Sequence, residues 1–438
     1  MKVAFLATGA ANMYCGSCMR DNTLVSAMKA LGHQVSMLPM YTPLRVDEDS
    51  ASEDYVFYSG IKTYLLQQFP NRTPWRDALL NVAGAQALTK LLTRFDIGSA
   101  VDPKANAELT ISMLRGENGN QAILLEEMVN ALSGTVRPQV VHITNTLISG
   151  PAREIKRALN VPIVCGLHGE DIFLDGLPAP YRSQAIELIR QNAAGIDHFI
   201  ATSQYYADMY GPLVGIPPEK ISIVWPGIAL SDYQNIGDQP KPIAGPLTIG
   251  YFARMAPEKG LHLLAEAFIS LAKSGDFPGL QLKVAGYMSS AHAKYIDGVR
   301  GRLKQAGVAG QVDIIGTASR QQKLDFFRSI DVFSVPAVYP DPKGLPMLEA
   351  LASGVPVVQP DHGAYPELIQ ATQGGLLHKP ENHQDLAEKL AHLLRNAVMR
   401  EEFRKQGRAA IHENFSAKRM AGDTVRVYES LTEQIATR

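Results

Sequence analysis

Short apolar runs and helical spacing alternate from the first residues of the chain. An apolar run at residues 2–7 leads into a glycine-containing turn, and helical periodicity then extends over residues 21–31. Gly32 ends this pattern, as glycine commonly does after a helix, and a second apolar run follows at residues 34–38. The order strand, turn, helix, strand predicts a βαβ unit with parallel strands.

The same alternation continues and predicts an α/β protein with two doubly wound, Rossmann-like domains. In the first half, further apolar runs lie at residues 140–143, 162–167, 198–201 and 221–224. In the second half, strands are predicted at residues 247–252 and at LQLKVAG, VDIIG, VFSV, VPVVQ and GGLLH, with helices starting near residues 261, 291, 321, 345 and 384. Parallel sheets bind ligands at the carboxyl ends of their strands, so we expect the active site in a cleft between the domains.

Proline and glycine crowd residues 236–245, which predicts a linker between the domains. The first domain is therefore placed at residues 1–235 and the second at residues 246–415. Residues 416–438 have helical spacing and are expected to pack back on the first domain.

Residues 41–138 depart from the alternation. They contain two helical patches, near residues 75–95 and 121–133, and one strand-like run at residues 55–60. An insertion of this length in a doubly wound domain commonly serves function. Its aromatic side chains could stack on a sugar or a lipid-linked group or could belong to the core, namely Tyr55, Phe57, Tyr58, Tyr64 and Trp75.

The composition of the 438 residues is that of a globular protein, with 46% hydrophobic and 19% charged residues, which excludes disordered and fibrous classes. Lysine and arginine number 42 and aspartate and glutamate 43, for a net charge of -1. Such a chain has no overall field to attract nucleic acid or anionic lipid, so no nucleic-acid partner is expected. Phosphate could bind only at a local basic site.

Three cysteines in so long a chain cannot form a disulfide framework, and the first residues lack the layout of a signal peptide. No window of about 18 uninterrupted apolar residues occurs. A cytoplasmic location with at most peripheral membrane contact is expected.

The strongest local signal for chemistry is the segment RMAPEKG, which follows the first strand of the second domain and opens a helix. Arg254 and Lys259 place two cations beside the positive end of that helix, an arrangement suited to a diphosphate. The alternative is a solvated basic pair that caps a turn.

A second signal is the segment from Asp341 to Glu349, which follows the predicted strand VFSV and its loop. Gly344 frees backbone amides at a helix start, and the two carboxylates can reach different parts of one extended polar ligand. Their separation along the chain is typical of ligand contacts rather than of a close acid–base pair. The alternative is an exposed loop aspartate with a satisfied helix glutamate.

His168 stands at the end of a predicted strand, where ligands of parallel sheets bind. A strand-end histidine can equally be a simple hydrogen-bonded residue. Glu170 and Asp171 could bind a metal, but no further histidine or cysteine at ligand spacing supports one.

Cys15 and Cys18 form a C-x-x-C pattern in the first βα turn, which could be a redox pair or half of a zinc site. Cys165 is the remaining cysteine, so two further ligands for zinc are missing. Small packed side chains in a tight loop are the favoured interpretation.

Together these segments resemble retaining nucleotide-sugar glycosyltransferases of the GT-B fold, the family-4 group, over nearly the whole chain. The likeness is most specific in the second domain. The segments that carry it are the Arg254-x4-Lys259 element, GLPMLEALASGVPVV from Gly344, Gly363-Ala-Tyr-Pro-Glu367, the N-terminal glycine loop, ALGHQV, PQVVHI and VCGLHGED.

The resemblance implies roles for residues of the second domain. Arg254 and Lys259 would hold the donor diphosphate and stabilise the leaving group. Glu349 would accept hydrogen bonds from the donor ribose, and Asp341 would contact hydroxyls of the transferred sugar. The backbone at Gly344, Leu345 and Pro346 would complete the donor site.

In the first domain, the resemblance implies that His168 faces the sugar across the cleft. Gly16 would let the first βα loop approach the donor closely, with Ser17 beside it. The family is generally metal-independent, so no cofactor is expected, and the cations take the role that Mg²⁺ has elsewhere. UDP is the expected donor nucleotide, with GDP or ADP as alternatives.

The chain departs from the family pattern at one end of the two-carboxylate element. Family members usually have glutamate at both ends with seven residues between, whereas here the first is Asp341, followed by Pro342 and Lys343 in place of a small–aromatic pair. The shorter side chain withdraws the acceptor oxygen by about one methylene. The Cys15–Cys18 loop also replaces a Gly-Gly turn, and we expect it to shape the acceptor side.

The expected activity is transfer of a hexosyl group from a nucleoside diphosphate sugar to an acceptor hydroxyl with retention of anomeric configuration. The acceptor, whether a sugar, a small molecule or a lipid-linked group, is left open. Three alternatives are kept, namely a non-catalytic nucleotide-sugar-binding protein, a redox-responsive protein that uses Cys15 and Cys18, and a non-hydrolysing sugar epimerase on the same fold.

Overall fold

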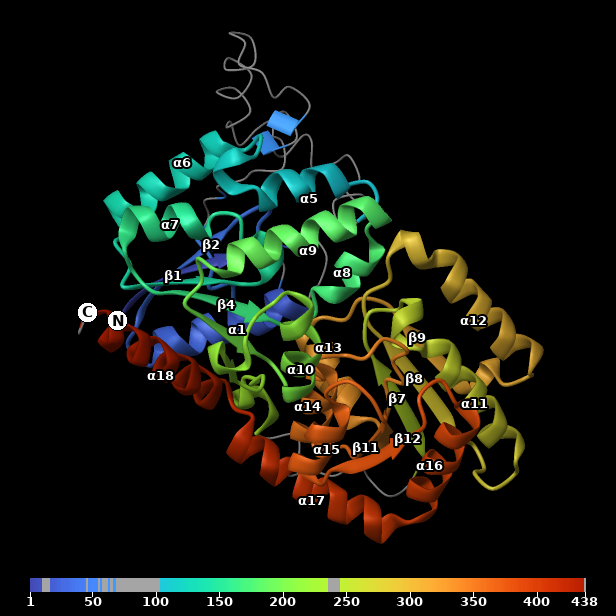
Figure 1. The fold of residues 1–438 in the computed structure, drawn as a ribbon. Coiled ribbons are helices and arrows are strands. Elements are labelled where there is room, and N and C mark those ends of the chain that lie inside the picture. Colours follow the sequence, from blue (N-terminus) through green and yellow to red (C-terminus); the bar gives the residue numbers. More distant parts are fainter. Residues whose placement is uncertain are drawn as a thin grey trace. The chain divides into compact units, whose positions relative to one another are not determined.

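The computed structural model describes residues 1–9, 16–44, 46–53, 56, 62–63, 66–67, 103–234 and 245–436. The chain forms two compact units, Met1–Trp225 with Met420–Arg438, and Pro226–Arg419 (Figure 1). Each unit contains a parallel sheet with helices on its faces. The predicted α/β class with two Rossmann-like domains is therefore confirmed.

The described strands of the first unit form one parallel sheet in the order β2-β1-β3-β4-β5-β6. Neighbouring strands run in the same direction, and β1 pairs with β3 so that Leu6 lies beside Ile143. The strands follow the predicted apolar runs because a parallel sheet is covered on both faces and needs nearly continuous hydrophobic sequence. Their bounds are β1 Lys2–Ala7, β2 Gln34–Pro39, β3 Val140–Ile143, β4 Ile163–Leu167, β5 His198–Ala201 and β6 Ile221–Ile223.

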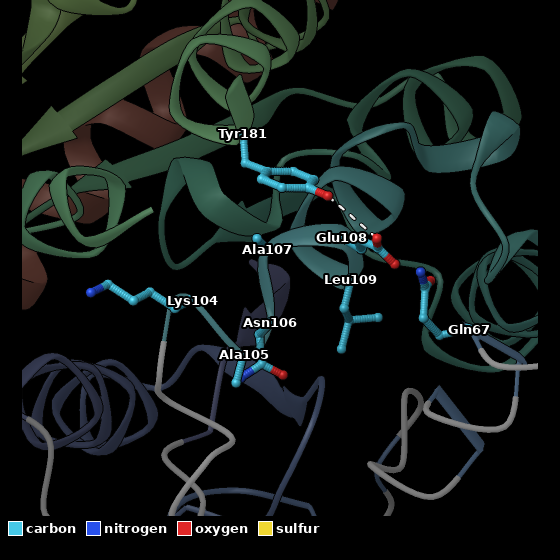
Figure 2. A pocket seen from close by; sticks show the side chains of 8 residues that line it. All are labelled: Gln67, Lys104, Ala105, Asn106, Ala107, Glu108, Leu109 and Tyr181. Carbon is cyan, nitrogen blue, oxygen red and sulfur yellow. Dashed lines mark hydrogen bonds between the residues drawn. The ribbon is translucent and has the colours of Figure 1, made fainter. Parts of the chain in front are cut away.

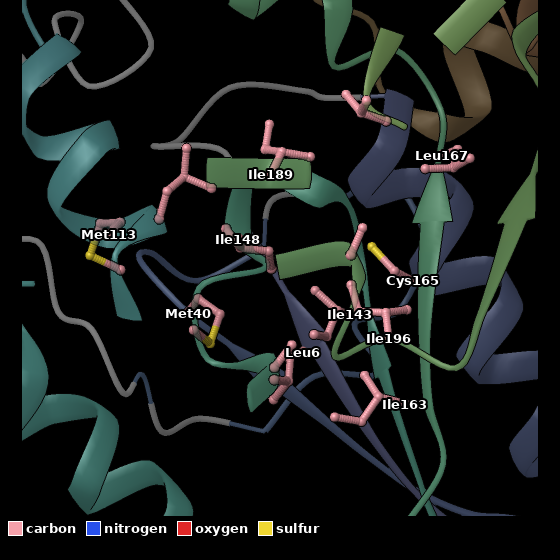
Figure 3. Packing of buried hydrophobic residues seen from close by; sticks show 14 of the residues in the cluster. Leu6, Met40, Met113, Ile143, Ile148, Ile163, Cys165, Leu167, Ile189 and Ile196 are labelled. Carbon is pink, nitrogen blue, oxygen red and sulfur yellow. The ribbon is translucent and has the colours of Figure 1, made fainter. Parts of the chain in front are cut away.

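Alternate residues of these strands build two separate cores, one on each face of the sheet. Leu6, Ile143 and Cys165 belong to the core drawn in Figure 3, whereas Phe5 and Val164 belong to the opposite one. The core of Figure 3 is covered by helices α5 Ala107–Leu114, α6 Ala122–Ala131, α7 Ala152–Leu159, α8 Asp171–Gly176, α9 Ala179–Ala193 and α10 Gln204–Leu213. The opposite core is covered by α1 Gly16–Ala30 and by the part of α18 Ala417–Ala436 that starts at Met420.

The second unit has the strand order β12-β11-β10-β7-β8-β9, again parallel. The chain direction across this sheet reverses between β7 and β10, and a crevice for ligands opens at such a point in doubly wound sheets. The strands are β7 Thr248–Phe252, β8 Gln281–Ala285, β9 Val312–Ile315, β10 Val332–Phe333, β11 Val357–Pro360 and β12 Gly375–His378. The helices are α11 Leu261–Lys273, α12 Ala293–Gln305, α13 Arg320–Arg328, α14 Leu345–Ala352, α15 Tyr365–Thr372, α16 His383–Arg395 and α17 Ala397–Asn414.

Several helices differ from the predictions. Helix α1 begins at Gly16 rather than at residue 21, because the polar residues Arg20, Asp21 and Asn22 are buried in it and break the apolar pattern. Helices α5, α15 and α17 were not predicted. Helix α17 buries only Gly407 and Ile411 among its residues, so it has little apolar periodicity to detect.

The unit boundary also lies earlier than the predicted linker. Residues from Pro226 onward belong to the second unit, where Ile228 pairs with Ser416 and Tyr233 bonds to Glu349. The predicted strand at residues 55–60 and helix at residues 75–95 lie outside the described residues, apart from Val56. Among the helices that are described, none has the length and apolar character needed to cross a membrane.

Candidate active site

In the second unit, the two loops on either side of the reversal point carry most of the predicted residues. Arg254 follows β7, and Lys259 ends a single 3-10 turn before α11. Gly260, at the next position, has a φ of 71°, and a Cβ there would lie 1.8 Å from the carbonyl oxygen of Pro336 in the loop after β10. Only glycine allows this contact, so Gly260 fixes the cationic turn against the second loop.

Both predicted cations contact carboxylates. Lys259 Nζ lies 2.5 Å from Asp341 Oδ2, and Arg254 Nη2 lies 2.5 Å from Glu258 Oε1. The side chains of Lys259 and Arg254 keep 18% and 33% of their surface exposed. Both cations therefore keep part of their surface accessible to a diphosphate. The structure thus brings Lys259 and Asp341 together.

Asp341 is buried, so the alternative of an exposed loop aspartate is wrong. Its Oδ1 accepts hydrogen bonds from the backbone N–H of Lys343 and of Gly344, at 2.9 and 3.1 Å. Burial alone would raise the pKa of this carboxyl, but the charges of Lys259 and Lys343 and these hydrogen bonds outweigh it and hold the pKa well below its usual range. Asp341 is therefore an ionised hydrogen-bond acceptor.

The GAYPE segment, one of those that carry the family resemblance, packs on the same loop. Gly363 has a φ of 64°, and a Cβ there would lie 2.7 Å from the carbonyl oxygen of Asp341. The N–H of Ala364 donates to that oxygen at 2.9 Å. The backbone on both sides of Asp341 is therefore fixed.

Glu349 lies in α14, which begins directly after Gly344, with Leu345 and Pro346 in its first turn. Its Oε1 accepts hydrogen bonds from Lys323 Nζ at 2.6 Å and from the Tyr233 hydroxyl at 3.1 Å.

Neither of these two partners of Glu349 was predicted from the sequence. The sequence did contain a signal for Lys323, namely a lysine among the apolar positions of α13. It shares the buried side of this helix with Leu324, Phe326 and Phe327.

In the first unit, His168 follows β4 directly and is buried. Its Nδ1 lies 3.1 Å from Ser17 Oγ in the first turn of α1, so the structure brings these two predicted residues together. Gly16 begins α1 and is exposed. The backbone N–H of His168 donates to Glu170 Oε2 at 2.8 Å.

Glu170 is the centre of a buried polar network. Besides His168, the hydroxyl of Tyr206 donates to Oε2 at 2.9 Å and the N–H of Thr146 donates to Oε1 at 3.3 Å. Burial raises the pKa of Glu170, and these hydrogen bonds oppose the shift. Among the residues that the structure describes, no group of three His, Cys, Asp or Glu side chains could hold a metal ion.

Cys18 and Cys165 are buried, and burial raises the pKa of the Cys165 thiol well above its ordinary value. Cys18 is thus a packed side chain in α1. Cys15 and the aromatic residues considered for the acceptor lie outside the described residues.

One pocket of about 320 Å³ in the first unit contains none of the predicted site residues (Figure 2). The Tyr181 hydroxyl donates to Glu108 across it at 3.3 Å. Its other lining residues are Gln67, Lys104, Ala105, Asn106, Ala107 and Leu109. Most of them belong to the insertion at residues 41–138.

Two families of glycosyltransferases match this chain. Residues 234–410 match the family described as Glycosyl transferases group 1, and residues 113–232 match Glycosyltransferase Family 4. The two matches together include every predicted site residue except Gly16 and Ser17.

Individual relatives are distant. The lipopolysaccharide core biosynthesis mannosyltransferase LpsB of Rhizobium meliloti is 28% identical over 185 residues, which are 42% of this chain and about half, 51%, of that protein. Glycogen synthase of Mycobacterium tuberculosis is 23% identical over 301 residues, or 67% of this chain and 69% of that enzyme.

Among solved structures, Anabaena Alr3699/HepE in complex with UDP matches with a TM-score of 0.68 and 16% identity. The match covers 98% of this chain and 100% of that one. At this identity the likeness shows a shared fold.

Proposed function

Because the chain belongs to the family-4 glycosyltransferases of the GT-B fold, we propose that it transfers a hexosyl group from a nucleoside diphosphate sugar to an acceptor hydroxyl with retention of anomeric configuration. The observation that carries the proposal is the contact between Lys259 and Asp341 beside the reversal point of the second sheet. Lys259 Nζ lies 2.5 Å from the ionised carboxylate of Asp341, which supports the proposed roles of Lys259 as a cation for the diphosphate and of Asp341 as an acceptor for sugar hydroxyls.

In the proposed reaction, Lys259 and Arg254 exchange their carboxylate partners for the donor diphosphate. The bond between the anomeric carbon and the phosphate oxygen breaks, and the negative charge that develops on the leaving group is stabilised by these cations. The acceptor oxygen bonds to the same face of the anomeric carbon, and its proton passes to the leaving diphosphate. No metal is required in this scheme.

The other predicted residues bind the substrates. Asp341 accepts hydrogen bonds from hydroxyls of the transferred sugar, and Glu349 accepts them from the ribose. His168 and Ser17 contribute from the first unit. UDP is the proposed nucleotide, which the UDP complex of Alr3699/HepE supports, and GDP and ADP are the alternatives.

The location and the acceptor belong to the same proposal. A cytoplasmic location is supported by the low cysteine content, three in 438 residues. The acceptor is a hydroxyl compound, and the pocket beside Tyr181 is a candidate for part of its binding site.

Two measurements on wild type and on Lys259→Ala test the proposal. The first is the affinity of each protein for UDP, GDP and ADP, and the second is the rate at which it transfers or hydrolyses the sugar of the matching sugar nucleotides. Lys259→Ala should lower turnover by roughly 100-fold to 1,000-fold. Lys304→Ala, an exposed lysine of α12 in the same unit, is the matched control and should leave turnover unchanged. Binding without transfer or hydrolysis would instead establish a non-catalytic nucleotide-sugar-binding protein.

A further inference from the structure

The two hydrogen bonds to Glu349 converge on one oxygen of its carboxylate. Lys323 Nζ and the Tyr233 hydroxyl both bind Oε1, at 2.6 and 3.1 Å. Oε2 accepts no hydrogen bond from any part of the chain that the structure describes. The two donors therefore fix the carboxylate through one oxygen and leave the other for a ligand.

Lys323 is unusual for a lysine because its side chain is only 2% exposed. Burying an ammonium group is costly unless it is paired, and lysine is almost never fully buried without a partner. In α13 it takes a position on the apolar side, next to Leu324 and Phe327. A hydrophobic residue would fill this position without that cost. The ion pair with Glu349 therefore explains why a lysine occupies it.

Tyr233 is held as firmly as Lys323. Its side chain is fully buried, and the guanidinium of Arg320 lies 5.7 Å from its ring centre. Arg320 also pairs with Asp232, one residue before the tyrosine, at 2.6 Å. Tyr233 is thus fixed by contacts of its own within the second unit.

We propose that Lys323 and Tyr233 are positioning residues that hold the Glu349 carboxylate so that Oε2 accepts hydrogen bonds from the ribose hydroxyls of the donor. The inference rests on the proposed function, in which Glu349 binds the ribose. It adds that the lysine offsets the carboxylate charge, so the site binds a neutral diol. It also assigns recognition of the ribose hydroxyls to a triad of Glu349, Lys323 and Tyr233. Lys323 lies 26 residues and Tyr233 lies 116 residues before Glu349 in the sequence.

Titration with UDP and with 2′,3′-dideoxy-UDP tests this role, because the second nucleotide lacks the ribose hydroxyls. Wild type should prefer UDP by roughly tenfold to a hundredfold, the range expected for hydrogen bonds to a charged group. In Lys323→Met this preference should fall at least fivefold, while the affinity for the dideoxy nucleotide changes by less than about twofold. If wild type binds GDP or ADP instead, that nucleotide and its dideoxy form are used.

Tyr233→Phe provides a second variant in case Lys323→Met unfolds, because it removes one hydroxyl and leaves no charge unpaired. Its preference for UDP should fall about threefold. Lys304→Met is the control and should keep the wild-type preference. Rescue is also expected, because Lys323→Arg retains a donor and should keep more of the preference than Lys323→Met.

The outcomes separate this inference from the proposed function. If the variants lose affinity for both nucleotides equally, Lys323 and Tyr233 have a merely structural role and the inference is overturned, while the proposed function stands. If wild type does not distinguish the two nucleotides, the ribose role of Glu349 fails, and the inference fails with it. If wild type binds none of UDP, GDP and ADP, the proposed function itself is overturned.

Discussion

Asp341 in the second unit and Glu170 in the first are both buried carboxylates, 7% and 2% exposed, yet their pKa values shift in opposite directions. Glu170 accepts hydrogen bonds from backbone N–H groups and a tyrosine hydroxyl, and burial raises its pKa. Asp341 accepts two backbone hydrogen bonds as well, but Lys259 and Lys343 lower its pKa despite burial. The cations make the difference, so Asp341 is suited to binding a polar substrate and Glu170 to holding the His168 loop.

Replacing Asp341 by asparagine tests this difference most strongly. The substitution keeps the shape of the side chain but removes the charge that attracts Lys259 and that, in the proposed function, strengthens hydrogen bonds from sugar hydroxyls. Transfer from a UDP-sugar should slow on the order of 100-fold, because a hydrogen bond to a charged group is lost in the transition state. Initial rates at saturating and limiting donor measure the effect.

Asp325→Asn is the matched control, since this exposed aspartate of α13 lies in the same unit. It should transfer at the wild-type rate. A transfer rate of Asp341→Asn within about threefold of wild type would show that the charge of Asp341 has no part in the reaction.

Glu170→Ala should act on stability instead. It leaves the N–H of His168 and the hydroxyl of Tyr206 without their buried acceptor, so the free energy of unfolding should fall by about 2–4 kcal/mol. Urea denaturation followed by tryptophan fluorescence and circular dichroism measures it. Glu187→Ala, at an exposed position of α9, should change stability by less than about 0.5 kcal/mol. Equal stability of the two variants would contradict the structural role of Glu170.

The opposite pKa shifts predict opposite pH dependences of stability. The lowered pKa of Asp341 means that its contribution is complete above its unfolded pKa, near about 4, and is lost as the pH falls toward its folded pKa. The raised pKa of Glu170 means that its contribution is complete below its unfolded pKa, near about 4.3, and is lost as the pH rises through its folded pKa.

Urea denaturation of wild type, Asp341→Asn and Glu170→Gln between about pH 3 and pH 8 checks both signs. The stability of wild type relative to Asp341→Asn should grow as the pH rises from about 3 to 5, whereas its stability relative to Glu170→Gln should shrink above about pH 4. Parallel curves for all three proteins would contradict the assignment of opposite pKa changes.

In both regions the sequence predicts the strands and the residues that directly follow them. Strands such as β1 and β3 are visible because a parallel strand buried on both faces is a continuous apolar run. Arg254, Lys259, Asp341 and His168 are visible because ligands bind just after such strands.

The partners of these residues are not visible in the same way. The sequence indicates Glu170 only as a possible metal ligand, and its role depends on Tyr206, 36 residues away. Lys323 reaches Glu349 from another helix, and Tyr233 from before the linker. Contacts between side chains on different elements leave no periodicity in the sequence, so the supporting residues of both sites required the structure.

Ser17→Ala is expected to have the smallest effect and refines the role given to the first unit. Glu170 fixes the backbone of His168, while Ser17 fixes its ring through the 3.1 Å contact with Nδ1. Losing this hydrogen bond should lower kcat/KM by about threefold to tenfold, because the ring gains freedom, with little change in the free energy of unfolding. Ser50→Ala, at an exposed position of the same unit, controls for loss of a hydroxyl. Two outcomes would contradict this role, namely a loss of stability as large as that of Glu170→Ala, or a kcat/KM equal to that of Ser50→Ala. In either case Ser17 does not orient the ring of His168 toward the substrate, and the first unit contributes a structural network alone.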